Sequence, residues 1–475
     1  MREFAVIGGG MGGCSIAALL HSQGHDVLLL EKEPTLGGCA STFKHDRNLY
    51  NAGATTLAGY HDGGIVRSLC NQIGVELDVI PTQKPITIIQ EGKTCVRYCD
   101  LAMFIQEMER FYPHPKHAEF WNLVHAIGDA FYTMEGFWYS NQSTFDKLRS
   151  LFSYFPLLKK FWPYLHTNAH RFIHNFYGNL SESFIDFLDA QILIVTQATS
   201  KHINFFTAAL ALGYTFNETH YPIGGMGAVC ERITSKMVDV RTSCEVKSIG
   251  RIGGIYHLNT SQGIIKARNL IMGTSHFESS KWFMDKEIVD YYNRYEKKNN
   301  YQSAFVLYMT LKTDRTFEHH TQIISKNTLA HTLSKSIFVS ISDARDNQIS
   351  PQGTYSVTAS IHTDARWWIT LEPAQYKKQK SDLESLLKKH ICDTLSITEA
   401  EILKCFSATP KTFKKYIHRS QLGGNALTFK NLLPRLPSND TPIKGLYQVG
   451  DTAYAAQGWP GVVMGVMNCA RLIHG

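Results

Sequence analysis

The sequence predicts an α/β fold with a discontinuous parallel-sheet domain and an inserted α+β domain. Two observations support this prediction. A β-prone run, a glycine-rich turn, a helical run and a second β-prone run lie between Phe4 and Glu31, and a similar strand, turn and helix begin at Gly445. Segments so far apart can share one domain only if the chain between them leaves and returns. The first domain is expected to comprise residues 1–95, 215–280 and 420–475, and the second residues 96–214 and 281–419.

Length and composition exclude several classes of protein. The 475 residues are 44% hydrophobic, which is enough for two or three domains. Lys and Arg number 48 against 41 Asp and Glu, and this net charge of +7 is spread along the chain. Such a distribution does not predict a nucleic-acid binder, but it favours contact with an anionic membrane surface. The ten scattered cysteines lack metal-ligand spacing and indicate reduced thiols, so no metal is expected.

The location follows from what the sequence lacks. No run of about 18 apolar residues appears, so no membrane-spanning helix is expected. Glycines interrupt the apolar stretch after Met1, which argues against a secretory signal. We expect a cytoplasmic protein that is soluble or peripheral on the inner face of the cytoplasmic membrane.

The N-terminal glycines predict a dinucleotide site. The β-prone run at residues 4–7 leads into G-x-G-x-x-G at Gly8, Gly10 and Gly13, and a helical run follows. In this pattern the first glycine permits a tight turn, the second lets backbone approach a pyrophosphate, and the third lets helix and strand pack closely. The helix N-terminus favours phosphate, and Glu31 is placed to accept from ribose hydroxyls. A tight turn alone would not explain the glycines and Glu31 together, so a Rossmann-like unit is predicted.

Motifs further along the chain resemble one family. A second glycine pair stands at Gly37 and Gly38, and residues 50–56 read Tyr-Asn-Ala-Gly-Ala-Thr-Thr. With residues 221–227, 342–353, 409–410 and the tail from Gly445, they follow the order found in FAD-dependent carotenoid (phytoene-type) desaturases and isomerases, most like the carotenoid C-3′,4′ desaturase branch. The resemblance implies an amine-oxidase-like fold, in which a Rossmann-like FAD-binding domain carries an inserted α+β substrate domain. The sequence departs from the family at Cys39, where many relatives have arginine, and at Asn51, where aspartate is usual.

The resemblance also implies which residues hold FAD. The backbone at Val246 would meet the adenine, and Asp451 would meet the ribityl hydroxyls, although a helix N-cap is the alternative role for this carboxylate. The turn before the last helix would present N–H groups to the flavin pyrimidine edge. The implied FAD contacts are Gly8, Gly10, Met11, Gly12, Gly13, Glu31, Lys32, Gly38, Cys39, Ala40, Ala54, Thr55, Val246, Gly450, Asp451, Gly461 and Val462.

The implied reaction is transfer of a hydride or electron pair between a hydrophobic polyene and flavin N5. A polyene has no ionisable group, so a long apolar channel is expected, and no catalytic acid or base is assigned. Desaturation is the reaction placed first. Cis–trans isomerisation and saturation would leave the same motifs, and amine oxidation uses the same fold. A non-catalytic lipid-binding escort is the alternative from another class. The partner is thus a lipid-soluble polyene, with no indication of oligomeric state.

Other polar residues are interpreted as structural. His114 and His117 flank a proline-rich turn and residues 319–320 are a histidine pair, all expected in solvated loops. Asp364 and Arg366 stand beside two tryptophans, either near a pocket or as a structural ion pair.

One stretch has two interpretations. Residues 151–164 place large apolar side chains beside the Lys159–Lys160 pair. Such a stretch could lie in the membrane interface, with aromatic side chains at headgroup level and lysines on phosphates, or it could form an ordinary helical cap on the substrate domain.

Overall fold

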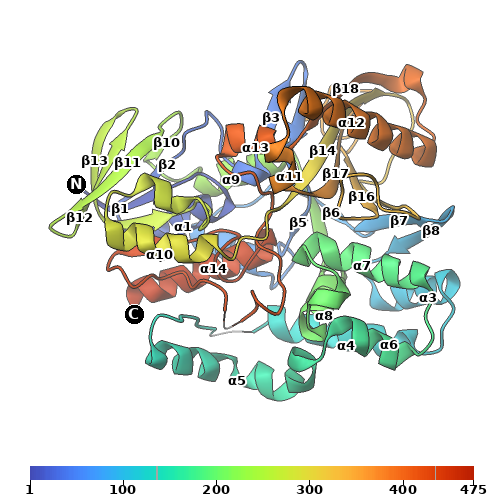
Figure 1. Ribbon diagram of the computed structural model, residues 1–475, viewed down its shortest axis with the longest axis horizontal. Coiled ribbons are helices and arrows are strands. Elements are labelled where there is room, and N and C mark those ends of the chain that lie inside the picture. Colours follow the sequence, from blue (N-terminus) through green and yellow to red (C-terminus); the bar gives the residue numbers. More distant parts are fainter. Residues whose placement is uncertain (135–136, 434) are drawn as a thin grey trace.

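The fold is built around two seven-stranded sheets and a layer of helices. The structure is a computed structural model that describes residues 1–134, 137–433 and 435–475. In Figure 1 the first sheet lies on the side of the N- and C-termini, the second lies at the opposite end, and the helical layer runs below both.

The first sheet gathers strands from both ends and the middle of the chain. Its order is β10-β2-β1-β13-β12-β11, and β19 also pairs with β13. The strands β1, β2, β10, β13 and β19 are parallel, whereas β11 and β12 form an antiparallel hairpin around the Gly253–Gly254 turn. The bounds are β1 (Arg2–Ile7), β2 (Val27–Leu30), β10 (Val240–Arg241), β11 (Val246–Ile252), β12 (Ile255–Thr260), β13 (Gly263–Met272) and β19 (Leu446–Gln448).

Alternate residues of the central strands face two separate cores. Phe4 and Val6 of β1 pack into one core, and Ala5 and Ile7 pack into the other. This alternation follows from the two-residue repeat of a strand, and both faces are apolar because both are covered. The first face is covered by α1 (Met11–Ser22), α2 (Ile65–Ile73), α9 (Met226–Thr234) and α14 (Gly458–His474), and the second by the β11–β12 hairpin and α10 (Lys286–Glu296).

The second sheet has the order β18-β14-β17-β16-β15-β7-β8. Adjacent strands in this sheet are antiparallel, except that β15 and β7 are parallel. One face packs against α11 (Ala365–Thr370) and α12 (Pro373–Leu395), and α13 (Pro410–Ile417) joins a smaller apolar cluster beside β14. The strands are β7 (Ile86–Gln90), β8 (Lys93–Arg97), β14 (Gln302–Lys312), β15 (His320–Ile324), β16 (Ser336–Ile341), β17 (Thr354–Asp364) and β18 (Ile402–Ala408).

Two small sheets lie between these parts. They are the pair β3 (Thr42–His45) and β4 (Asn48–Asn51), and the triplet β5 (Leu57–Ala58), β9 (Thr219–Pro222) and β6 (Val79–Thr82).

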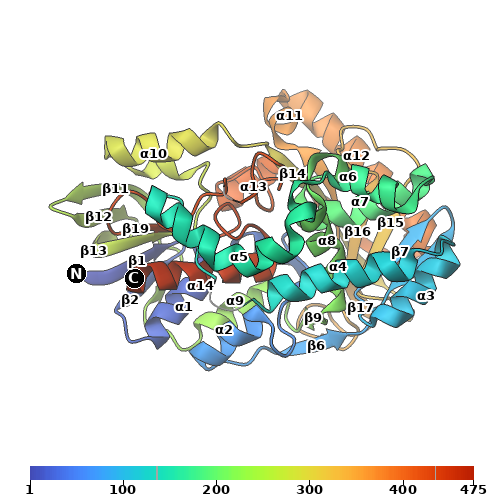
Figure 2. The same cartoon turned by 90° about the horizontal axis from the view of Figure 1, so that it is seen from below.

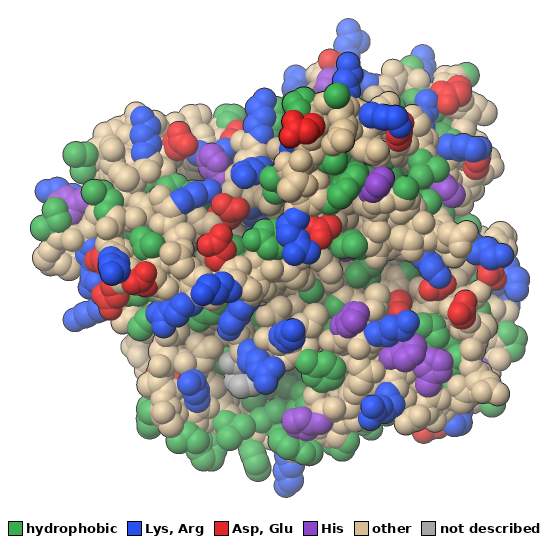
Figure 3. Space-filling model, viewed as in Figure 1, with side chains coloured by type: hydrophobic (Ala, Val, Ile, Leu, Met, Phe, Trp, Pro, Cys, Tyr) green, Lys and Arg blue, Asp and Glu red, His purple; other side chains and the backbone are tan. Residues whose placement is uncertain are grey.

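Six helices form a layer with its own aromatic-rich core. Helix α5 runs along the lower edge in Figure 1 and faces the viewer in Figure 2, and hydrophobic side chains gather at the same edge in Figure 3. Helix α5 contains Pro156 and Pro163 and bends at Phe161, because proline disrupts the ladder of helical hydrogen bonds. The helices are α3 (Leu101–Phe111), α4 (His117–Tyr132), α5 (Thr144–His166), α6 (Ala169–Tyr177), α7 (Glu182–Thr196) and α8 (Phe205–Gly213).

Among the described residues, no helix is both long enough and apolar enough to cross a membrane.

Candidate dinucleotide site

A cavity of about 920 Å³ lies where the parallel strands of the first sheet end. Its lining includes Gly8 after β1, Glu31 after β2, Gly273 after β13 and Gly450 after β19. The carboxyl ends of parallel strands are where α/β folds bind their ligands, because the loops there can diverge around a crevice.

The glycine turn between β1 and α1 shapes the first wall. Gly8 has a φ of +99°, in the region that favours glycine. A Cβ atom on Gly13 would lie 1.9 Å from the Gly8 carbonyl oxygen, so only glycine lets helix and turn pack this closely. A Cβ on Gly10 would find its nearest described atom at 3.9 Å, which leaves room for a ligand against the backbone. The first N–H groups of any helix have no intrahelical acceptor. Gly10, the N-cap of α1, has no side chain that could accept from them.

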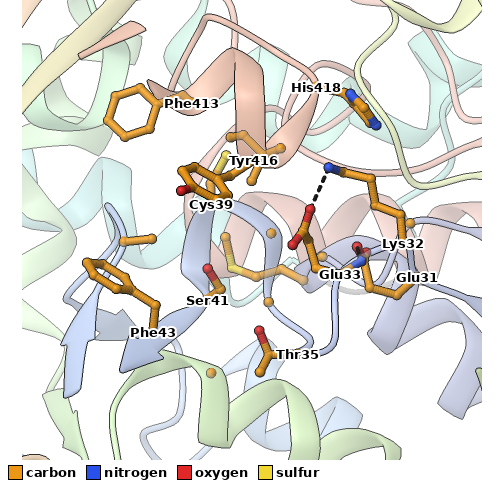
Figure 4. Close-up of a pocket in the computed structure, with 18 of the residues that line it drawn as sticks. Glu31, Lys32, Glu33, Thr35, Cys39, Ser41, Phe43, Phe413, Tyr416 and His418 are labelled. Carbon is orange, nitrogen blue, oxygen red and sulfur yellow. Dashed lines mark hydrogen bonds and ion pairs between the residues drawn. The ribbon is translucent and has the colours of Figure 1, made fainter. Parts of the chain in front are cut away.

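Glu31 is fixed by two backbone N–H groups. Gly9 donates to Glu31 Oε2 over 2.7 Å, and Glu33 donates to Glu31 Oε1 over 2.9 Å. Burial raises the pKa of this carboxyl above its ordinary value, against the lowering effect of these two hydrogen bonds. A carboxylate has about four lone-pair directions, so two remain for hydroxyl donors in the cavity. Lys32 lies beside it and pairs with Glu33 over 2.5 Å, as Figure 4 shows.

The second glycine pair lies directly against the first. Gly37 donates to the Gly9 carbonyl over 2.7 Å, and a Cβ on Gly37, whose φ is +120°, would meet the backbone of Ser41 at 2.5 Å. Cys39, two residues after Gly37, lines the cavity, and burial raises the pKa of its thiol.

An arginine from a distant segment faces the same place. The guanidinium of Arg419 forms two hydrogen bonds of 2.9 Å to the two carboxylate oxygens of Asp451, and it also donates to the Gln421 carbonyl over 3.0 Å. Both side chains are nearly buried, at 11% and 15% exposed, and both line the cavity. Asp451 therefore does not act as a helix N-cap, because Gln457 takes that position on α14. Arg419 also acts electrostatically on Cys39, the position where the sequence lacks the arginine of many relatives.

The far part of the cavity is aromatic. Phe43 meets Tyr308 edge to face at 5.2 Å, and Tyr308 stacks on Phe406 at 5.0 Å between ring centroids. Phe413 and Tyr416 of α13 complete this wall. Figure 4 shows Phe43 and Phe413 on the opposite side of the pocket from Glu31 and Lys32, with Tyr416 beside Cys39 between them. One cavity thus combines a polar, glycine-lined part with an aromatic part.

Twelve of the seventeen predicted FAD contacts line this cavity, and their role in cofactor binding stays a prediction. They are Gly8, Gly10, Met11, Gly12, Glu31, Lys32, Gly38, Cys39, Val246, Gly450, Asp451 and Val462. The other five, Gly13, Ala40, Ala54, Thr55 and Gly461, lie outside the lining. A Cβ on Gly461 would stand 2.9 Å from the Ala455 carbonyl oxygen, so this glycine serves close packing at the start of α14.

The prediction that the histidine pair lies in a solvated loop is wrong. His320 belongs to β15, an inner strand of the second sheet, and is 2% exposed. Its Nε2 lies 3.3 Å from the Thr56 hydroxyl, and Nε2 of His319 lies 3.3 Å from the Thr55 carbonyl oxygen. Burial lowers the pKa of both imidazoles. The pair therefore fastens the 54–56 loop to the second sheet.

Two further expectations are resolved. His117 is also buried and lies 3.1 Å from the Tyr177 hydroxyl, so the prediction of a solvated loop is wrong there too. His114 is only partly buried and lies 3.1 Å from the Tyr177 carbonyl oxygen. Asp364 and Arg366 form a surface ion pair of 2.9 Å, the structural alternative.

Comparison with known proteins agrees with the first sheet. Residues 6–73 match the model of the NAD(P)-binding Rossmann-like domain. The chain is 23% identical to the chloroplastic prolycopene isomerase of Daucus carota, over 99% of this chain and 80% of that protein.

Solved structures agree with the whole architecture. An oxidoreductase from Methanosarcina mazei superposes with a TM-score of 0.65 at 18% identity, over 99% of this chain and 100% of the other. Wild-type putrescine oxidase bound to putrescine gives a TM-score of 0.64 at 13% identity, over 100% of this chain and 99% of the other. The chain is thus similar over nearly its full length to a prolycopene isomerase, and it shares the overall fold of these two solved structures.

Proposed function

We propose that the protein is an FAD-dependent enzyme that acts on the carbon–carbon bonds of a hydrophobic polyene. The observation that carries the proposal is a single cavity in which a dinucleotide-type wall continues into an aromatic one. The full-length similarity to a protein named prolycopene isomerase supports the choice of a polyene.

The residues present fit FAD. The cavity of about 920 Å³ lies near the upper end of the range of roughly 300–1,000 Å³ for cofactor and ligand sites. The space beside Gly10 accommodates a pyrophosphate against the start of α1, and Glu31 keeps two lone-pair directions for ribose hydroxyls. Next to the glycine turn, Asp451 and Arg419 would hold the ribityl chain. When bound, the flavin supplies exchange of a hydride or electrons with a carbon chain.

The protein's own residues would bind and orient the substrate. The wall of Phe43, Tyr308, Phe406, Phe413 and Tyr416 offers apolar faces to a conjugated chain, which has no charge to be neutralised. The apolar side chains of this wall make it a poor place for water and favour a lipid-soluble ligand. No acid or base is needed to hold such a substrate.

Among the reactions on a polyene, isomerisation is the one to test first. From the sequence we place desaturation first although isomerisation would leave the same motifs, and a relative that aligns over nearly the full chain carries the name prolycopene isomerase. The test uses purified protein, handled anaerobically, with vesicles that contain a poly-cis carotene, once with oxidised flavin and once after reduction by dithionite. Isomerisation changes the cis–trans composition of the carotene, by chromatography, without adding double bonds.

Each outcome has a distinct meaning. A longer conjugated system that appears while the flavin band bleaches would establish desaturation, and one double bond fewer would establish saturation. Turnover of primary amines with no change in carotene would support amine oxidation. The whole proposal fails if freshly purified protein contains no flavin and takes up none from solution.

A further inference from the structure

Helix α5 exposes a row of large apolar side chains to solvent. Among the described residues, seventeen large hydrophobic side chains are exposed, and six of them belong to this one helix of 23 residues. A cluster of exposed apolar side chains on one element marks an interaction surface, whereas scattered ones need no explanation. The outer face of α5 is defined by Phe145, Leu148, Leu151, Phe152, Phe155 and Trp162, each between 50% and 73% exposed.

The opposite side of the same helix is already used. Ser150, Tyr154, Leu157 and Phe161 are buried, and Tyr154, Leu157 and Phe161 belong to the core of the helical layer. From Phe145 to Phe155 each member of the outer face has another three or four residues away, and Trp162 follows Phe155 by seven, about two helical turns. This spacing places them together on the side that this core does not use. Helix α5 is therefore apolar on two opposite sides, and it cannot hide the outer face by rotating.

Basic side chains surround the outer face. Lys147, Arg149, Lys159 and Lys160 lie on α5, where the only acidic residue is Asp146, which is engaged in the N-terminal capping box with Ser143. Across residues 1–134, 137–433 and 435–475, these four cations form no ion pair. Four unpaired cations beside an apolar row match the charge of an anionic surface with an apolar interior.

We propose that the outer face of α5 docks flat on the surface of an anionic phospholipid bilayer. Its six apolar side chains enter below the headgroups, and the four cations bind lipid phosphates. A second copy of the chain fits less well, because a symmetric contact through this face would bring like charges together. The inference deepens the proposed function in one respect, since docking would bring the enzyme to the bilayer in which a polyene dissolves.

The test is flotation of the full-length protein with vesicles of equal parts phosphatidylcholine and phosphatidylglycerol. The test variant carries Phe152→Ser, Phe155→Ser and Trp162→Ser. The control carries Val238→Ser, Ile252→Ser and Ile264→Ser, which are 69% to 86% exposed but lie far from α5 in sequence. Each large apolar side chain removed should weaken membrane partitioning about tenfold, so the test variant should lose roughly a thousandfold and the control almost nothing. Thermal unfolding should show both variants folded.

Charge supplies a second, independent readout. The variant Lys159→Glu, Lys160→Glu should lose its preference for anionic over pure phosphatidylcholine vesicles. The proposal is overturned if the test variant floats as well as the wild type, or if the wild type itself does not float. It is also overturned if light scattering shows a wild-type dimer that the three serine substitutions of the test variant dissociate. Flotation needs neither flavin nor carotene, and the flavin content of the same fractions reports separately on the proposed function.

Discussion

Two walls of the cavity are built by different means. The α1 wall consists of backbone: Gly8, Gly10 and Gly13 shape a turn, and Glu31 is held by N–H groups within its own neighbourhood. In the Asp451 wall, Arg419 and Asp451 meet as side chains from separate segments. The α1 wall depends on steric fit and the Asp451 wall on charge, so the two should respond differently to mutation.

The largest effect is expected from a single methyl group in the glycine turn. Gly13→Ala places a Cβ atom 1.9 Å from the Gly8 carbonyl oxygen, so α1 must move away from β1. The free energy of unfolding should fall by about 3 kcal/mol, and flavin should be lost with it. Urea unfolding and flavin absorbance measure the two effects.

A matched control is available in α4. Gly128 is also a buried helical glycine, but a Cβ there has no described atom within 4 Å. Gly128→Ala should leave flavin content unchanged and stabilise the protein by up to about 1 kcal/mol, because alanine favours helix. Equal losses of stability and flavin content in Gly13→Ala and Gly128→Ala would contradict the steric account of the turn.

A smaller, electrostatic effect is expected at the Asp451 wall. Arg419→Met leaves the nearly buried Asp451 carboxylate without its cation, which should cost about 2 kcal/mol of stability and weaken flavin binding at least about tenfold. The double variant Arg419→Met, Asp451→Asn removes both charges and should recover most of the stability but not the flavin affinity. Titration of apoprotein with FAD, alongside urea unfolding, separates these outcomes. Recovery of both would mean that the ion pair serves folding alone.

The smallest effect is a pH dependence on the charged side of the cavity. His276 follows the cavity residue Ser275, and its backbone N–H donates to the Thr452 hydroxyl over 3.0 Å. Burial lowers the pKa of its imidazole to about 3. The unfolded chain binds the proton below about pH 6.5, so this histidine lowers stability as the pH falls from there towards 3. His276→Phe should reduce that slope by up to about 1.4 kcal/mol per pH unit. Urea unfolding between pH 7.5 and 5 tests this.

The difference between the two walls also explains what the sequence could predict. The α1 wall depends on residues within about thirty positions of one another, and their spacing alone predicts a strand, a turn, a helix and an acidic residue. Asp451 was also predicted as a cavity residue, because the strand and helix around it have a recognisable pattern.

The partner of Asp451 was not predictable in the same way. Nothing near Arg419 in sequence marks it as a cavity residue, and it reaches Asp451 only through tertiary packing. The error at residues 319–320 has a similar cause. A polar pair normally indicates a loop, but here β15 is enclosed between β16 and β7, and backbone carbonyls and a threonine satisfy the imidazoles.

The shared strand β13 determines when the cavity can be completed during synthesis. β13 pairs with β1 on one side; on the other side β12 pairs with its first half and β19 with Leu270–Met272. β19 begins at Leu446. At roughly 5–20 residues per second, a ribosome needs about 10–35 s to travel from the end of β13 to β19. Throughout that time the nascent chain has the α1 wall but lacks the Asp451 wall. Flavin is therefore expected to be captured late, after α14 has left the ribosome, and the unpaired edge of β13 must be kept from other nascent chains until then.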